Sequence, residues 1–66
     1  MNYQVWISKK TTNGEQSNEL GFFSPEHCKA NYQLWVDTAR SEGFEQLVLN
    51  PIGLDRTSDK RIVIKL

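Results

Sequence analysis

The sequence predicts a small α+β fold of order ββαββ, in which one helix packs on one face of a mostly antiparallel four-stranded sheet. Three observations favour this fold. A hairpin dipeptide separates two segments with alternating apolar residues, capping residues bound one helical segment, and two further strand-like segments follow. The 66 residues suffice for a single domain, which we place at 1–66.

The first two strands are predicted from the turn dipeptide Asn13-Gly14. Both positions of a two-residue type I′ turn need a positive φ, and this dipeptide suits them best. Folding the chain about this turn forms two apolar cross-strand pairs, Ile7 with Leu20 and Val5 with Phe22. We expect both pairs to lie beneath the helix and Trp6 to lie on the opposite face of the sheet.

The helix is predicted from its two ends. Ser24 can accept hydrogen bonds from the free N–H groups of the first turn, and Pro25 suits the first helical position. The helix should run to about Glu42, because Gly43 fits the left-handed position that follows a helix. Apolar residues at helical spacing form one stripe between these ends, namely Cys28, Tyr32, Trp35, Val36 and Ala39. We expect this stripe to pack on the sheet.

Two strands follow the helix. The first is predicted at 46–50, with Leu47 and Leu49 as core candidates and Pro51 ending it, since proline cannot donate to a ladder. The second, at 61–66, alternates in two sets: Ile62, Ile64 and Leu66 on one side, and Arg61, Val63 and Lys65 on the other. The intervening segment 51–60 is predicted to be a loop or a loose hairpin.

The composition excludes several classes of protein. Eight basic residues balance eight acidic ones, so no net field attracts nucleic acid or an anionic membrane. Cys28 is the only cysteine, which excludes an internal disulfide. No apolar run has transmembrane length, and the first predicted strand begins too close to Met1 for a signal peptide. We therefore expect a cytoplasmic protein without membrane contact.

No catalytic, metal or cofactor signature is found. His27 and Cys28 are adjacent in the predicted helix, so their side chains point about 100° apart and do not form a nucleophile and base. One His and one Cys cannot complete a zinc site within a monomer. Asp55 and Asp59 lack the spacing of a calcium loop. We expect no enzymatic activity, no cofactor and no small-molecule substrate.

The sheet face opposite the helix is the main candidate contact surface, because the sequence offers nothing else to cover it. Its predicted binding residues are Trp6, Phe23, Val63, Arg61 and Lys65. Strand parity places Phe23 on this face, but as the residue before the helix cap it could instead turn inward onto Cys28. Leu34, roughly opposite the apolar stripe, marks a second candidate contact on the helix.

Two functions fit this surface. The leading hypothesis is a non-enzymatic protein-interaction module (an inhibitor, accessory or self-associating factor) that uses the open face or pairs a sheet edge with another chain. A homodimer would be the simplest way to bury Trp6. The alternative is single-stranded nucleic-acid binding, with Trp6 and Phe23 stacking on bases while Lys10, Arg61 and Lys65 contact phosphates.

Overall fold

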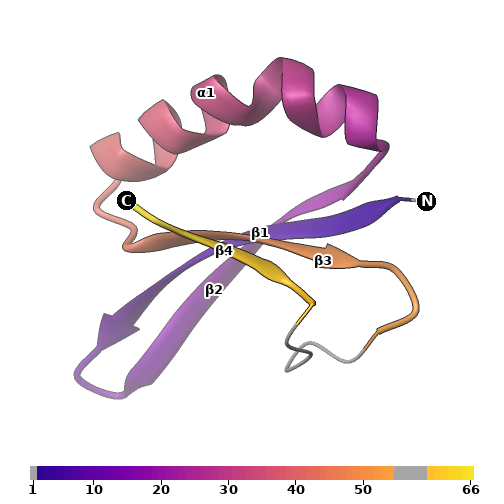
Figure 1. Ribbon diagram of the computed structural model, residues 1–66. Coiled ribbons are helices and arrows are strands. Elements are labelled where there is room, and N and C mark those ends of the chain that lie inside the picture. Colours follow the sequence, from indigo (N-terminus) through magenta and orange to yellow (C-terminus); the bar gives the residue numbers. More distant parts are fainter. Residues whose placement is uncertain (1, 55–59) are drawn as a thin grey trace.

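The computed structural model describes residues 2–54 and 60–66, and confirms the predicted ββαββ order. The elements are β1 (Tyr3–Thr11), β2 (Gly14–Phe23), α1 (Pro25–Ser41), β3 (Gln46–Pro51) and β4 (Ile62–Lys65). The four strands form one antiparallel sheet in the order β2-β1-β3-β4, and α1 lies on one face of it (Figure 1). Asp55 and Asp59 lie outside the described residues.

The β1–β2 hairpin differs from the predicted one in its turn. Thr11 pairs with Gly14, so Thr12 and Asn13 form the connection. Neither of these two residues has a positive φ, which falls instead on Gly14 at 126°. The predicted type I′ turn centred on Asn13-Gly14 is therefore wrong, and every partner on β2 is shifted along the strand.

A β-bulge in β2 changes the register a second time. Trp6 pairs with Glu19, whereas its neighbour Val5 pairs with Gly21, so Leu20 is the extra residue. Gly21 has a φ of 133°, which a residue with a side chain rarely adopts. The glycine thus permits the backbone geometry that the bulge requires.

The bulge reverses the facing of the last residues of β2, because side chains alternate with a period of two. Phe22 pairs with Gln4 on the face opposite the helix and is 59% exposed, whereas Phe23 packs against the core beneath the helix. The prediction that Leu20 and Phe22 lie beneath the helix is wrong. Of the two alternatives for Phe23, the inward one is confirmed.

Helix α1 begins and ends at the predicted caps. The hydroxyl of Ser24 accepts a hydrogen bond from the N–H of His27 at 3.2 Å. At the other end Gly43 has a φ of 81°, and the N–H of Phe44 donates to the carbonyl oxygen of Ala39 at 2.9 Å. These bonds satisfy backbone groups that a helix end leaves unpaired.

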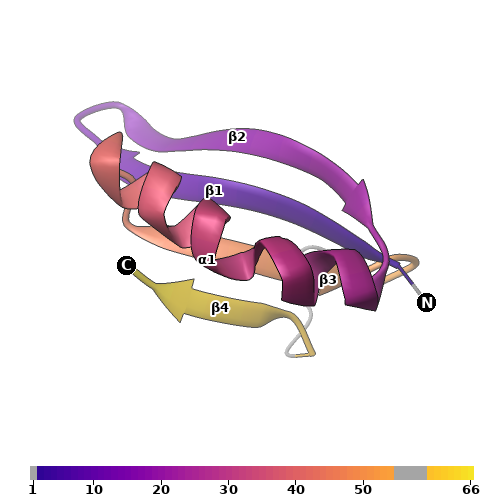
Figure 2. The same ribbon diagram turned by 90° about the horizontal axis from the view of Figure 1, so that it is seen from above.

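The core lies between α1 and the facing sides of β1 and β3. Its buried residues are Val5, Ile7, Cys28, Val36, Ala39, Phe44, Leu47 and Leu49. The predicted apolar stripe of the helix is buried at Cys28, Val36 and Ala39, but Tyr32 is 38% exposed. Seen from above, the helix lies over the middle of the sheet and β4 lies beside it (Figure 2).

Candidate protein-binding groove

The sheet face opposite the helix is more covered than the sequence predicts. Trp6 lies on this face, outside the helix–sheet core, and yet it is only 5% exposed. The neighbouring side chains Ser8, Val48 and Asn50 are also buried. The predicted facing of Trp6 is therefore right, but the prediction that its indole is available to a partner is wrong.

The other predicted site residues divide between two places. Val63 pairs with Val48, which in turn stands between it and Trp6 in one row across the sheet. Val63 and Lys65 are exposed and share one side of β4, with the half-buried Arg61 directly before the strand. The structure brings these three residues together.

Phe23 and Leu34 lie away from β4. Phe23 stacks on His27 with ring centroids 4.8 Å apart and an interplanar angle of 8°, and it contacts Trp35 at a centroid distance of 5.0 Å. Leu34 is 62% exposed on the outer side of the helix. The two rings on which the nucleic-acid hypothesis depends, those of Trp6 and Phe23, are thus both packed into the protein.

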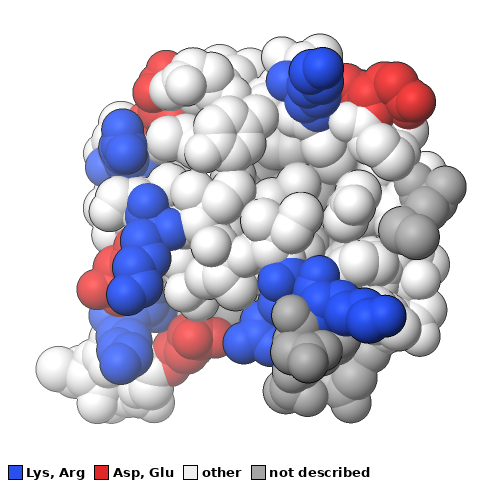
Figure 3. Space-filling view, viewed as in Figure 1, with Lys and Arg blue, Asp and Glu red and all other residues white. Residues whose placement is uncertain are grey.

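An apolar groove lies between α1 and β4. It has a volume of about 370 Å³ and is lined by Cys28, Lys29, Tyr32, Leu49, Ile62 and Ile64. Ile62, on the side of β4 that faces the groove, is 47% exposed. The middle of this face of the molecule is uncharged, and side chains of both signs lie around its margins (Figure 3).

Strand β4 borders this groove and is one of the two edge strands of the sheet, the other being β2. The N–H of Leu66 donates to the carbonyl oxygen of Glu45 at 3.0 Å, in line with the β3–β4 register. Hydrogen-bonded pairs alternate along an antiparallel ladder, so the backbone groups of Val63 and Lys65 point away from β3. Within 2–54 and 60–66, no strand pairs with this outer edge.

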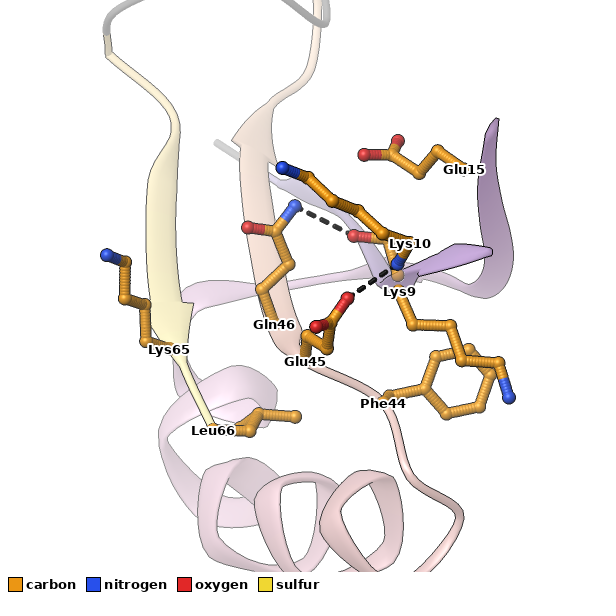
Figure 4. Close-up of a pocket in the computed structure, with 9 residues that line it drawn as sticks. Lys9, Lys10, Glu15, Phe44, Glu45, Gln46, Lys65 and Leu66 are labelled. Atoms are coloured by element: carbon orange, nitrogen blue, oxygen red, sulfur yellow. Dashed lines mark hydrogen bonds between the residues drawn. The ribbon is translucent and has the colours of Figure 1, made fainter. Parts of the chain in front are cut away.

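A second hollow, of about 500 Å³, lies beside the hairpin and is lined by charged and polar residues together with Phe44 and Leu66 (Figure 4). The backbone N–H of Lys10 donates to Oε1 of Glu45 at 2.5 Å, and Nζ of Lys9 lies 4.9 Å from the centroid of the Phe44 ring. Glu15 and Lys65 also line the hollow. Because acidic and basic groups are mixed here, the hollow lacks the field of one sign that would attract an anion.

Sequence reasoning missed the groove, because it assigned the apolar residues of the helix stripe and of β4 to the core. The width of the sheet could have revealed it. Four strands spaced about 4.8 Å apart span about 14 Å between the outer strand axes, whereas a helix with its side chains is about 10 Å wide. A single helix therefore leaves part of the sheet uncovered at an edge.

Other kinds of site find little support in the part of the chain that the structure describes. No group of three His, Cys, Asp or Glu side chains there could hold a metal ion. No helix in that part is long and apolar enough to cross a membrane. Comparisons with protein-family models, curated proteins and solved structures found no match.

Proposed function

We propose that this chain is a non-enzymatic protein-interaction module that binds an extended segment of another protein along β4. The observation that carries the proposal is the free edge of β4 beside an apolar groove formed in part by its own side chains, Ile62 and Ile64. An added strand would hydrogen-bond to the backbone of Val63 and Lys65 and place alternate side chains in the groove.

The exposed edge and the groove support one another. An unpaired strand edge offers main-chain hydrogen bonds that do not depend on the side chains of the added strand. The groove adds side-chain selectivity, since Tyr32 and Ile62 are large apolar side chains that remain partly open to solvent. The face around Trp6 offers less, because the residues at its centre are already buried.

The test is a selection of ten-residue peptides from a random display library, followed by titration of the ¹⁵N-labelled chain with the selected peptides. We expect amide shifts concentrated at Ile62–Lys65 and along the groove side of α1. Tyr32→Ala should weaken binding about tenfold, the scale of losing one well-placed aromatic contact. Leu34→Ala is the matched control on the outer side of the helix and should leave the affinity unchanged.

The proposal fails if the selected peptides shift a different face, or if the library yields no peptide that shifts β4. It also fails if Leu34→Ala weakens binding as much as Tyr32→Ala does.

A further inference from the structure

We infer that the segment bound at β4 alternates apolar and acidic residues. This inference rests on the proposed strand addition and names the chemistry of its partner. A strand added to β4 would direct one set of side chains into the groove, beside Ile62 and Ile64, and the other set to the opposite face, beside Val63 and Lys65. The first set must be apolar, because the groove is lined mainly by apolar side chains.

The charges on β4 determine which residues are favoured in the second set of partner side chains, those beside Val63 and Lys65. Segment 60–66 contains three basic residues and no acidic one. Lys65 is exposed on the side of β4 away from the groove, where the second set of side chains would lie. Opposite charges across neighbouring strands stabilise a sheet, and like charges directly opposite each other destabilise it. Acidic side chains in the partner are therefore favoured, and basic ones are disfavoured.

A second copy of the chain matches this surface less well. If two β4 strands pair antiparallel with the groove sides together, no register that pairs only residues 60–66 places an acidic residue opposite Lys65. Strand β2 of a second copy would supply Glu15 and Glu19, but its alternate residues Gln16 and Asn18 are polar. Placing these amides in an apolar groove would remove them from water without a partner.

Three synthetic seven-residue peptides test the inference by NMR titration of the whole chain. The first alternates glutamate and valine, the second alternates lysine and valine, and the third has the composition of the first with its glutamates and valines in two blocks. We expect the first to bind about tenfold more tightly than either of the others and to shift Ile62–Lys65. Higher salt should reduce this difference, because the charges are exposed.

Two charge-reversal variants localise the effect. Lys65→Glu should abolish or invert the preference for the acidic peptide. Lys10→Glu makes the same change on β1, which β3 separates from β4, and should retain the preference. Both lysines are exposed, so both variants should keep the amide spectrum of the folded chain.

The outcomes separate this inference from the proposed function. Equal binding of the acidic and basic alternating peptides, both at β4, overturns the acidic preference and leaves strand addition intact. If no peptide, synthetic or library-selected, shifts β4, both proposals fail. If the chain without peptide shows concentration-dependent shifts at β4, a second copy is the occupant and the acidic partner is overturned.

Discussion

Trp6 is the largest side chain on the sheet face opposite the helix, and its burial makes it a structural residue. An aromatic residue of this size removes about 150–250 Å² from water when it is buried. The pair Trp6 and Phe22 shows how position decides the role of such a ring. Both lie on the same face of the sheet, but Trp6 is on a central strand and Phe22 is on an edge strand.

We predict that Trp6→Ala lowers the free energy of unfolding by about 3–5 kcal/mol, the usual range for truncating a buried aromatic residue. A domain of 66 residues has about 3–10 kcal/mol in total, so this variant should be close to unfolding. Phe22→Ala, at an exposed ring, should cost less than about 1 kcal/mol. Urea denaturation measures both. Equal losses would show that Trp6 is not buried as described.

Cys28 is one of the residues of α1 that line the groove, and its burial affects its ionisation. Burial raises the pKa of the Cys28 thiol above its ordinary value of 9.0, and a backbone hydrogen bond offsets part of this shift. The folded state therefore favours the neutral thiol. The stability that results is complete below pH 9.0 and is lost as the pH rises through the folded-state pKa.

We predict that the rate of Cys28 alkylation by iodoacetamide rises with a midpoint above pH 9.0 in the native chain, and at a lower pH when the chain is unfolded in urea. Between the unfolded and native midpoints, the free energy of unfolding of the wild type should also fall more steeply with pH than that of Cys28→Ala, which lacks the titrating thiol. A native midpoint at or below that of the unfolded chain would contradict the burial of the thiol.

At the scale of elements, the bulge in β2 determines which aromatic residue supports the helix. The ring of Phe23 covers Gly21, and a Cβ atom at Gly21 would lie 3.1 Å from a carbon of that ring. Gly14 offers a comparison on the same strand. Its φ of 126° is as unusual as the 133° of Gly21, but a Cβ atom there would meet nothing within 4 Å.

We predict that Gly14→Ala lowers the free energy of unfolding by about 1–3 kcal/mol through backbone strain alone. Gly21→Ala should lower it by about 1 kcal/mol more, because the added methyl group also crowds Phe23. In a double-mutant cycle with Phe23→Leu, this additional loss should disappear. Equal losses for the two alanine variants, measured by urea denaturation, would contradict the close contact between Gly21 and Phe23.

How far the sequence predicts each element depends on how local its determinants are. The caps of α1, the core positions of Leu47 and Leu49 in β3 and the alternation in β4 depend on neighbouring residues, and they were predicted correctly. The bulge in β2 was not predicted. Its extra residue goes with the packing of Phe23 beneath the helix, which the turn and the alternation of the strands do not reveal.

At the scale of the whole molecule, the candidate site results from the difference in width between the four-stranded sheet and the single helix that covers it. One helix covers the central strands, and β4 lies beside it (Figure 2). Side chains of the helix and of β4 therefore line a groove between them. None of the groove's lining residues is unusual by itself, which is why motif analysis could not find the site. The outer edge of β4 completes the candidate site, and the contribution of its backbone N–H groups to peptide binding can be tested directly.

We predict that N-methylvaline at position 63, introduced by chemical synthesis of the chain, weakens binding of the acidic alternating peptide about tenfold. The N–H of Val63 points to the free edge, so methylation removes one hydrogen bond to the added strand, worth about 0.5–1.5 kcal/mol, and obstructs its approach. The free energy of unfolding should stay within about 0.5 kcal/mol of the unmodified chain, because no bond to β3 is lost.

N-methylisoleucine at position 64 is the matched control, because the N–H of Ile64 points toward β3 and belongs to the ladder. This modification should lower the free energy of unfolding by at least about 1 kcal/mol, since it leaves a ladder carbonyl of β3 without its donor. Comparison of the two syntheses separates the outer edge of β4 from its inner edge. If methylation at 63 leaves peptide affinity unchanged, the peptide is not held by main-chain bonds to β4, and strand addition is excluded as the mode of binding.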